Sequence, residues 1–246
     1  MNICLFEPEE INRPLSLKDE RVQHLIKVLH KKEGDTFTAG IVGGKSGTAV
    51  ITSLKEELTF SFEPSGDGKK LSNLKMIIGF PRPIQLKRLL RDVAGLGVCQ
   101  VHLTGTELGE KSYMQSTLVE KGSVYKMLYD GTVQAGSTHI PEYFLHNRLE
   151  NCLNTIEEEK ESAVKILLDN VKPQLSLLEY MQTLSDEKKS GKIIAAIGSE
   201  RGWTDKEREL FLKKGYTVCS MGERILRTET AATVAASIIL AAQGVI

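Results

Sequence analysis

The chain has 246 residues, of which 32 are basic and 32 acidic, so its net charge is zero. This length allows one large domain or two modest ones, each able to bury a core without disulfides or structural metals. The hydrophobic fraction of 41% is ordinary for a globular protein. Balanced charge excludes nucleic-acid binding by bulk electrostatics alone, so any such binding must depend on local basic patches.

The four cysteines, Cys4, Cys99, Cys152 and Cys219, are far apart and form no CxxC pair. We therefore expect buried thiols in a reducing cytosol, rather than disulfides or zinc ligands. The N-terminus is acidic within seven residues and lacks the basic head and apolar core of a signal peptide. The uncharged run at residues 230–246 is short and rich in alanine, so a buried helix is expected there and no membrane span.

The first 70 residues are expected to form a small β-barrel. Apolar runs separated by glycine-rich or charged turns occupy residues 35–41, 47–54 and 58–64. One helix interrupts them, and its apolar stripe consists of Val22, Leu25, Ile26, Val28 and Leu29. The polar segment 64–73 has turn-forming composition and is predicted to be the domain boundary.

Residues 39–46, AGIVGGKS, come close to the phosphate-loop pattern of nucleotide-binding proteins. A working phosphate loop opens a helix whose N-terminal amides hold the phosphates, but the next residues, GTAVIT, are typical of a strand. The segment is therefore predicted to be a glycine hairpin turn.

From Leu74 onward strands and helices alternate, which is the signature of a parallel α/β sheet. Residues 135–156 carry little pattern and are expected to begin as a loop. The expected strands are residues 74–80, 98–105, 163–170, 192–197 and 216–220, and the expected helices cover residues 86–93, 123–133 and 176–189.

Two glycine-bearing loops, residues 197–203 and 221–231, follow the last two expected strands. The helix between them has a capping-box pair in Thr204 and Glu207, and Gly215 is placed to close its C-terminus. Loops that leave the carboxyl ends of neighbouring parallel strands meet in a crevice where ligands bind. On spacing alone, these glycines could equally serve only tight turns.

Other catalytic patterns are absent from the sequence. No GxSxG or HExxH occurs, and residues 95–100, GLGVCQ, precede a strand and are expected to form a turn rather than a dinucleotide fingerprint. No two histidines are spaced i and i+4, so a metal site is not expected; the five are His24, His30, His102, His139 and His146.

Three motifs together resemble one known family. They are HLIKVLHKKEGD at residues 24–35, IGSERGWTDKE at 197–207 and MGERILRTETAA at 221–232. They resemble the RsmE family, which methylates N3 of a uridine in small-subunit ribosomal RNA, and the resemblance covers nearly the whole chain. ILRTETA is the most specific of its motifs.

The resemblance implies an α/β fold of the SPOUT class. Residues 1–70 would form a PUA-like, RNA-binding β-barrel, and residues 71–246 would form the methyltransferase domain, a parallel sheet with a C-terminal trefoil knot. The knot would hold S-adenosylmethionine, and a homodimer would build the site from both subunits. The implied substrate is 16S ribosomal RNA or the small ribosomal subunit, which implies a cytoplasmic enzyme.

Carried onto this chain, the family's cofactor contacts fall in the two glycine loops. Arg227 is the first candidate for stabilising charge on the uridine carbonyls as N3 loses its proton. The alternative is that Arg227 only anchors its loop through Glu223 or Glu229. The expected cofactor residues are Ile197, Gly198, Glu200, Gly202, Met221, Gly222, Ile225, Leu226, Arg227 and Thr230.

No histidine is an evident base, so positioning together with Arg227 is expected to carry most of the rate, with solvent accepting the proton. RNA would be held by basic side chains of two helical regions. They are Lys27, Lys31, Lys32, Lys87, Arg88 and Arg91.

The sequence departs from the family pattern at several positions. The first glycine loop has Ser199 and Arg201 where the family has proline and a second glycine. Charged family residues are replaced by His30, Gly95, Val133 and Ser137. Two alternatives therefore stay open: a SPOUT methyltransferase with another base or RNA as target, and an RNA-binding relative without turnover. The target nucleotide is not specified by the sequence.

Overall fold

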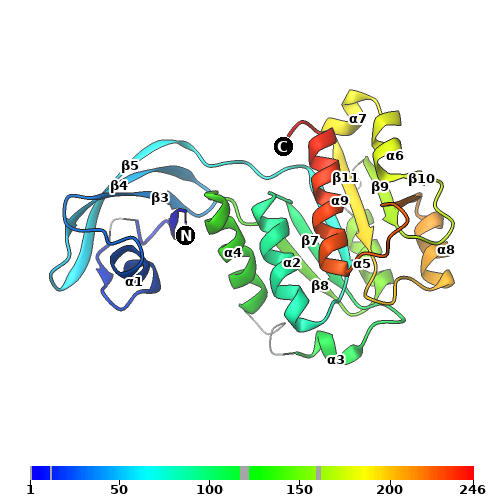
Figure 1. The fold of residues 1–246 in the computed structure, drawn as a ribbon, viewed down its shortest axis with the longest axis horizontal. Helices are drawn as coiled ribbons and strands as arrows, with labels where there is room; N and C mark the ends of the chain where they lie inside the picture. The colour runs from blue at the N-terminus through cyan, green and yellow to red at the C-terminus, as the bar shows by residue number, and fades with distance from the viewer. Residues whose placement is uncertain (1, 12, 117–121, 159–161) are drawn as a thin grey trace. The chain divides into compact units, whose positions relative to one another are not determined.

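The computed structural model describes residues 2–11, 13–116, 122–158 and 162–246 (Figure 1). The chain divides into two compact units, each with its own sheet. The first comprises Met1–Lys70 and Tyr129–Ile140, and the second comprises Leu71–Leu128 and Pro141–Ile246. The sequence pattern did not indicate that Tyr129–Ile140 belongs with the first unit.

The first unit is a five-stranded sheet in the order β1-β3-β4-β5-β2. Burial alternates along its central strand β4, as expected where one face packs on a core. Core side chains include Phe6, Phe37, Ile51 and Leu58. The elements are β1 (Cys4–Phe6), β2 (Leu15–Ser16), α1 (Glu20–Lys27), β3 (Thr36–Ile41), β4 (Lys45–Ser53) and β5 (Glu57–Asp67).

Helix α1 begins at a side-chain cap and is shorter than its apolar stripe predicted. Asp19 accepts a hydrogen bond from the backbone N–H of Arg21 at 2.8 Å. Val22 and Leu25 are buried, as predicted. The helix ends at Lys27, so Val28 and Leu29 lie beyond it, 58% and 42% exposed. The prediction that Val28 and Leu29 continue the apolar stripe of this helix was wrong, because the helix ends before them.

The segment 39–46 is a hairpin turn, as predicted. It joins β3 to the antiparallel strand β4, and Gly43 has a φ of +68°. The expectation that residues 64–73 are all turn was wrong for the first four residues. Strand β5 continues to Asp67 because residues 64–67 pair with β4 at Lys45, Ser46 and Gly47.

The second unit is a seven-stranded sheet in the order β10-β12-β9-β11-β6-β7-β8, and all its neighbouring strands are parallel. Strands β6, β9 and β11 are apolar and centrally placed. The strands are β6 (Leu74–Gly79), β7 (Gln100–Thr104), β8 (Glu142–His146), β9 (Ala163–Leu168), β10 (Leu175–Ser176), β11 (Lys192–Ile197) and β12 (Thr217–Ser220).

Helices cover both faces of this sheet. Helices α2 and α9 contact each other over β6 and β11 (Figure 1). Helices α5 and α8 cover the opposite face, where Leu153 and Phe211 share a core with Ile194. The helices are α2 (Pro83–Gly95), α3 (Lys111–Met114), α4 (Ser123–Ala135), α5 (Leu149–Glu158), α6 (Leu177–Thr183), α7 (Asp186–Ser190), α8 (Asp205–Lys213) and α9 (Thr228–Ala242).

Two expectations for this unit were wrong. The loop expected from residue 135 is confirmed for residues 136–141, but residues 142–144 lie in β8, and α5 follows. Strand β8 lacks clear alternation because it is an edge strand whose side chains are mostly half-buried or exposed. The single helix expected at 176–189 is two helices. The chain is extended at Leu184 (ψ 143°), and Ser185 caps α7 as a new N-terminus.

The capping box before α8 is confirmed: Thr204 and Glu207 exchange both hydrogen bonds of the motif. Gly215 follows the helix with a φ of +80°, as a closing glycine should. The predicted fold class is confirmed, whereas the trefoil knot stays a prediction. None of the helices in the described part of the chain combines the length and apolar character that a bilayer span needs.

Candidate functional site

Loops at the carboxyl ends of β9, β11 and β12 line one cavity of about 130 Å³. Strand β9 lies between the other two strands, so its following loop joins the two glycine loops in the cavity wall. The lining residues are Leu168, Asp169, Asn170, Ile197, Gly198, Ser199, Glu200, Gly202, Trp203, Met221, Arg224, Ile225, Leu226, Thr228 and Ala231. We call this space the first cavity.

The loop after β11 is a tight main-chain turn. The N–H of Gly202 donates to the carbonyl oxygen of Ser199 at 2.8 Å, and Gly202 has a φ of +70°. A Cβ atom on Gly198 would lie 2.9 Å from backbone atoms of Gly202. No flexible side chain could move to relieve that contact. Glycine at position 198 therefore allows the two ends of this turn to pack directly against each other.

Both family departures in this loop have side-chain partners. Ser199 is buried, and its hydroxyl oxygen lies 3.1 Å from that of Thr106. Arg201 is 66% exposed and forms an ion pair with Glu110 at 3.2 Å. Arg201 is not among the residues that line the first cavity. The bulky Arg201 side chain is therefore held away from the first cavity by Glu110, whereas the small Ser199 is part of its lining.

The loop after β9 is fixed by a carboxylate. Asp169 accepts a hydrogen bond from Arg208 Nε at 2.7 Å and another from the backbone N–H of Val171 at 3.0 Å. The Asp169 side chain is only 8% exposed. Asp169 and Asn170 were missed from the sequence because β9 is distant in the chain from the glycine loops.

The loop after β12 leads directly into α9. Thr228 at the helix start donates to the carbonyl oxygen of Gly198 at 3.4 Å, which ties the two glycine loops together. Arg227 is the N-cap residue of α9 and its side chain is exposed. Among the described residues, no ion pair joins Arg227 to Glu223 or Glu229.

Seven of the ten expected cofactor residues line the first cavity: Ile197, Gly198, Glu200, Gly202, Met221, Ile225 and Leu226. Gly222, Arg227 and Thr230 do not, although Arg227 lies between the lining residues Leu226 and Thr228. Arg224 lines the cavity and was not singled out from the sequence.

The expected RNA-binding side chains lie on two helical regions. Lys27 ends α1, and Lys31 and Lys32 follow it; Lys27 and Lys32 are exposed and Lys31 is half-buried. Lys87, Arg88 and Arg91 are exposed on α2.

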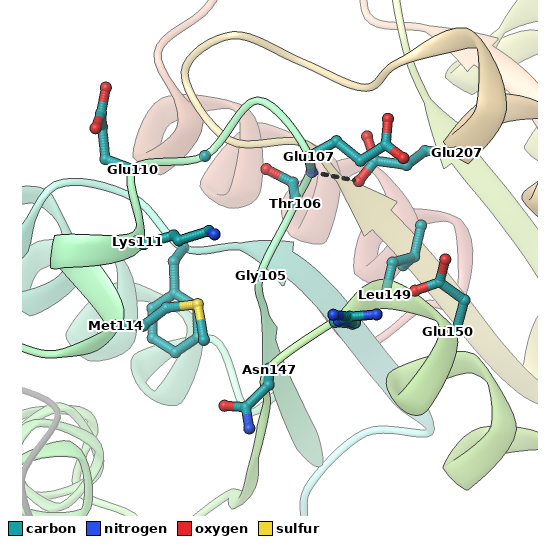
Figure 2. A pocket seen from close by; sticks show the side chains of 13 residues that line it. Gly105, Thr106, Glu107, Glu110, Lys111, Met114, Asn147, Leu149, Glu150 and Glu207 are labelled. Carbon is teal, nitrogen blue, oxygen red and sulfur yellow. Dashed lines mark hydrogen bonds between the residues drawn. The ribbon is translucent and has the colours of Figure 1, made fainter.

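A second cavity of about 250 Å³ lies at the ends of β6, β7 and β8 (Figure 2). Figure 2 shows Lys111 pointing toward the segment at Gly105 and Thr106, with Glu107 and Glu207 meeting beyond it. The backbone N–H of Glu107 donates to Glu207 at 2.9 Å. The lining residues are Phe80, Gly105, Thr106, Glu107, Gly109, Glu110, Lys111, Met114, Asn147, Arg148, Leu149, Glu150 and Glu207.

The two cavities are linked through their walls. Thr106 lines the second cavity and contacts Ser199, which lines the first. Glu207 of the second cavity caps the helix that follows the first glycine loop. A ligand in the second cavity would therefore lie beside the loop that lines the first.

A buried group of histidine and cysteine side chains was also missed. His102, His146 and Cys152 come from β7, β8 and α5 and lie together in the second unit. Burial, with a contribution from His146 and Lys75, lowers the pKa of His102 to about 3. Burial also lowers the pKa of His146 and raises the pKa of the Cys152 thiol to about 12. The expectation of no metal rested on sequence spacing and stays a prediction.

Three further family departures are absent from the lining of both cavities. Gly95 is exposed at the end of α2. Val133 packs against Ile3 and Leu5, and the Ser137 hydroxyl donates to the carbonyl oxygen of Lys69 at 3.1 Å. None of the three lines either cavity. Val133 therefore serves local packing and Ser137 a local hydrogen bond.

Residues 69–240 match the family model described as an RNA methyltransferase domain. The chain is 41% identical over 250 residues to the Ribosomal RNA small subunit methyltransferase E of Treponema pallidum, covering 98% of this chain and 91% of that protein. It is 33% identical to Ribosomal RNA small subunit methyltransferase E 1 of Borreliella burgdorferi, covering 99% and 98%.

Among solved structures, the chain is similar to a Ribosomal RNA small subunit methyltransferase E from Neisseria gonorrhoeae bound to S-adenosyl methionine. The TM-score is 0.78 at 21% identity, with 98% of this chain and 97% of that chain covered. At this identity the likeness shows the shared fold.

Proposed function

The chain belongs to the Ribosomal RNA small subunit methyltransferase E family, and from this we propose that it transfers a methyl group from S-adenosylmethionine to N3 of a uridine in 16S ribosomal RNA. The observation that carries the proposal is the first cavity, where both family motif loops line one space at the carboxyl edge of a parallel sheet. A ribosomal RNA substrate places the reaction in the cytoplasm.

The residues of the first cavity fit an adenosyl cofactor. Ile197, Met221 and Leu226 offer apolar walls for the adenine, and the close main-chain turn at Gly198 offers backbone groups. Asp169 and Asn170, in the loop after β9, add polar groups to the cavity lining. We propose that the surrounding chain forms the trefoil knot of the family. S-adenosylmethionine supplies the electrophilic methyl group.

The chain must promote loss of the N3 proton from the uridine. Charge then grows on the O2 and O4 carbonyl oxygens, and a guanidinium held nearby stabilises it. Arg227 is our candidate because it follows the cavity residue Leu226 and begins α9. Neither cavity is lined by a histidine within the described residues, so solvent is proposed to accept the proton.

The second cavity is our candidate for the target nucleotide. It shares the Thr106–Ser199 contact with the first cavity. Lys111 and Arg148 stand among four glutamates of the lining and can each contact one phosphate oxygen. Asn147 supplies an amide that can both donate to and accept from a base edge. Flanking RNA would contact Lys27, Lys31, Lys32, Lys87, Arg88 and Arg91.

We further propose that the active form is a homodimer in which both subunits build the site. Ile225 in the loop after β12 is 90% exposed, and Ile84 in α2 is 72% exposed. Large exposed apolar side chains, of which Ile225 lines the first cavity, are what a second subunit would cover. Light scattering should give twice the 27.2 kDa chain mass; the chain mass itself would contradict this part of the proposal.

The reaction is tested by incubating the chain with small ribosomal subunits and S-adenosylmethionine labelled in its methyl group, followed by nucleoside analysis of the RNA. Label in N3-methyluridine is the expected result. Label in another nucleoside would replace the proposed target with a different base. Cofactor binding without label in RNA would instead identify an RNA-binding relative that lacks turnover.

A further inference from the structure

Two histidines and a cysteine from three separate elements meet inside the second unit. One potential ligand atom from each of His102, His146 and Cys152 lies within 4.8 Å of the others. Their exposed fractions are 0%, 8% and 0%. His102 and His146 lie on paired strands, where His146 is opposite Thr104, two residues beyond His102. Neither cavity is lined by any of the three.

Apolar side chains surround Cys152, whereas His102 also has the buried Lys75 and the amide of Gln100 nearby. Cys152 belongs to a core cluster with Leu149, Leu153 and Ile156 of the same helix. Imidazoles are costly to bury in such a place unless their nitrogens have partners. His102 Nδ1 and His146 Nε2 lie 3.1 Å apart and can share one hydrogen bond. One nitrogen of each histidine and the Cys152 sulfur therefore lie close enough together for a single ion to contact all three.

We propose that His102, His146 and Cys152 form a binding site for a divalent metal ion of borderline softness, with Zn²⁺ as the reference ion. Two imidazole nitrogens and one thiolate are a donor set that Zn²⁺ accepts. Tetrahedral Zn²⁺ sets such donors about 3.3–3.6 Å apart. The nitrogen pair at 3.1 Å is close to that separation. Three protein ligands leave one position for water.

A second layer of side chains orients the His102 ring. His102 Nε2 lies 3.5 Å from Gln100 Oε1, and Gln100 Nε2 donates to Glu142 at 2.8 Å. The ring also stacks on Phe144, with centroids 4.7 Å apart. Metal-binding histidines usually have a partner on the nitrogen that does not bind the metal. Here Gln100 is the partner of Nε2, and Nδ1 of His102 faces His146.

The ion would have a structural role beside the second cavity. His146 immediately precedes Asn147 and Arg148, which line that cavity, and the His146 carbonyl oxygen accepts from Gly105 of the same lining at 2.9 Å. Bonds from the metal ion to His102 of β7, His146 of β8 and Cys152 of α5 would hold these lining residues in place. The site is independent of the cofactor loops, so it can exist whether or not the chain transfers methyl groups.

Metal binding is tested on the full-length chain, first stripped of metal by a chelator and then titrated with Co²⁺. The expected result is one ion per chain, with the visible absorption of a tetrahedral ion and a thiolate-to-Co²⁺ charge-transfer band. Zn²⁺ should displace the Co²⁺ and remove both signals. No absorption change in the folded wild-type chain would show a hydrogen-bonded histidine pair only, and would overturn the proposal.

Variants assign the ligands. Cys152→Ala should lose the charge-transfer band and weaken binding at least about 100-fold, while Cys99→Ala, which removes a half-buried thiol outside the cluster, should leave both unchanged. Zn²⁺ at about 100 times its Kd should raise the wild-type Tm by about 5–10 °C and leave that of a folded Cys152→Ala chain unchanged. An equal rise in both would contradict the site.

Discussion

The first and second cavities lie along the same edge of one parallel sheet but are built differently. The first is formed largely by main-chain turns, and Asp169, Glu200 and Arg224 are its only charged lining residues among those described. The second is lined by six charged side chains from distant parts of the chain. Four of these six are glutamates, and the two cations are Lys111 and Arg148. The difference suits two kinds of binding: a cofactor held by shape and backbone groups, and a nucleotide held by individual side-chain contacts.

The largest effect is expected at Arg227, which follows the first-cavity residue Leu226. Arg227→Ala should lower kcat by about 10²–10³-fold, because charge on the uridine carbonyls loses its stabilising partner. Cofactor affinity should stay unchanged, since Arg227 does not line the first cavity. Calorimetry with S-adenosylmethionine and single-turnover methyl transfer separate these quantities.

Arg227→Lys is the matched variant, because lysine keeps the positive charge but lacks the planar guanidinium with its paired N–H donors. Its rate should fall between those of the wild type and Arg227→Ala. Near-normal turnover in a folded Arg227→Ala chain would exclude this residue from the chemistry.

A smaller effect is expected from a substitution that strains the main chain of the first cavity. Gly198→Ala places a Cβ 2.9 Å from the Gly202 backbone, so the turn must open. We expect cofactor affinity to fall by about 10–100-fold, as strain of about 1–3 kcal/mol would produce. Gly66→Ala is the control because its Cβ would meet open space. Equal cofactor affinities for the two variants would contradict the role of this turn.

The contrast between local main-chain turns and side chains from distant parts of the chain also explains what could be predicted from the sequence. Thr204, Glu207 and Gly215 marked α8 correctly because capping signals are local in the chain. Asp169 was missed because only the strand order places β9 between β11 and β12.

The second cavity could not be predicted in the same way. Glu107 and Glu207 are 100 residues apart in sequence, with Arg148 between them, and the three meet only through the fold. His102, His146 and Cys152 were missed for the same reason, since helical spacing rules say nothing about groups on different elements. Val28 and Leu29 show the opposite error, where a periodic pattern continued past the end of the real helix.

The second cavity is tested by removing its cations. Lys111→Ala or Arg148→Ala should raise KM for RNA about three- to tenfold, as expected for the loss of about 1 kcal/mol of contact. Cofactor affinity should not change, because neither residue lines the first cavity. Lys206→Ala, an exposed change on α8 outside both cavities, is the control. A change in cofactor affinity alone would reverse the roles of the two cavities.

The smallest effects are expected on the basic helical regions. Lys27→Glu or Lys87→Glu should weaken RNA binding a few-fold and reduce the slope of log K against log salt by about 0.7 per lost phosphate contact with single-stranded RNA. Filter binding over a salt series measures both, with Lys206→Glu as the control. An unchanged slope would show that these lysines are only solvated.

The most direct test of the account is a crystal structure of the chain grown with S-adenosylmethionine. We predict density for the cofactor in the first cavity, in contact with Gly198, Met221 and Leu226. Cofactor density in the second cavity, or no measurable binding by a folded chain, would contradict the assignment of the glycine loops as the methyl-donor site.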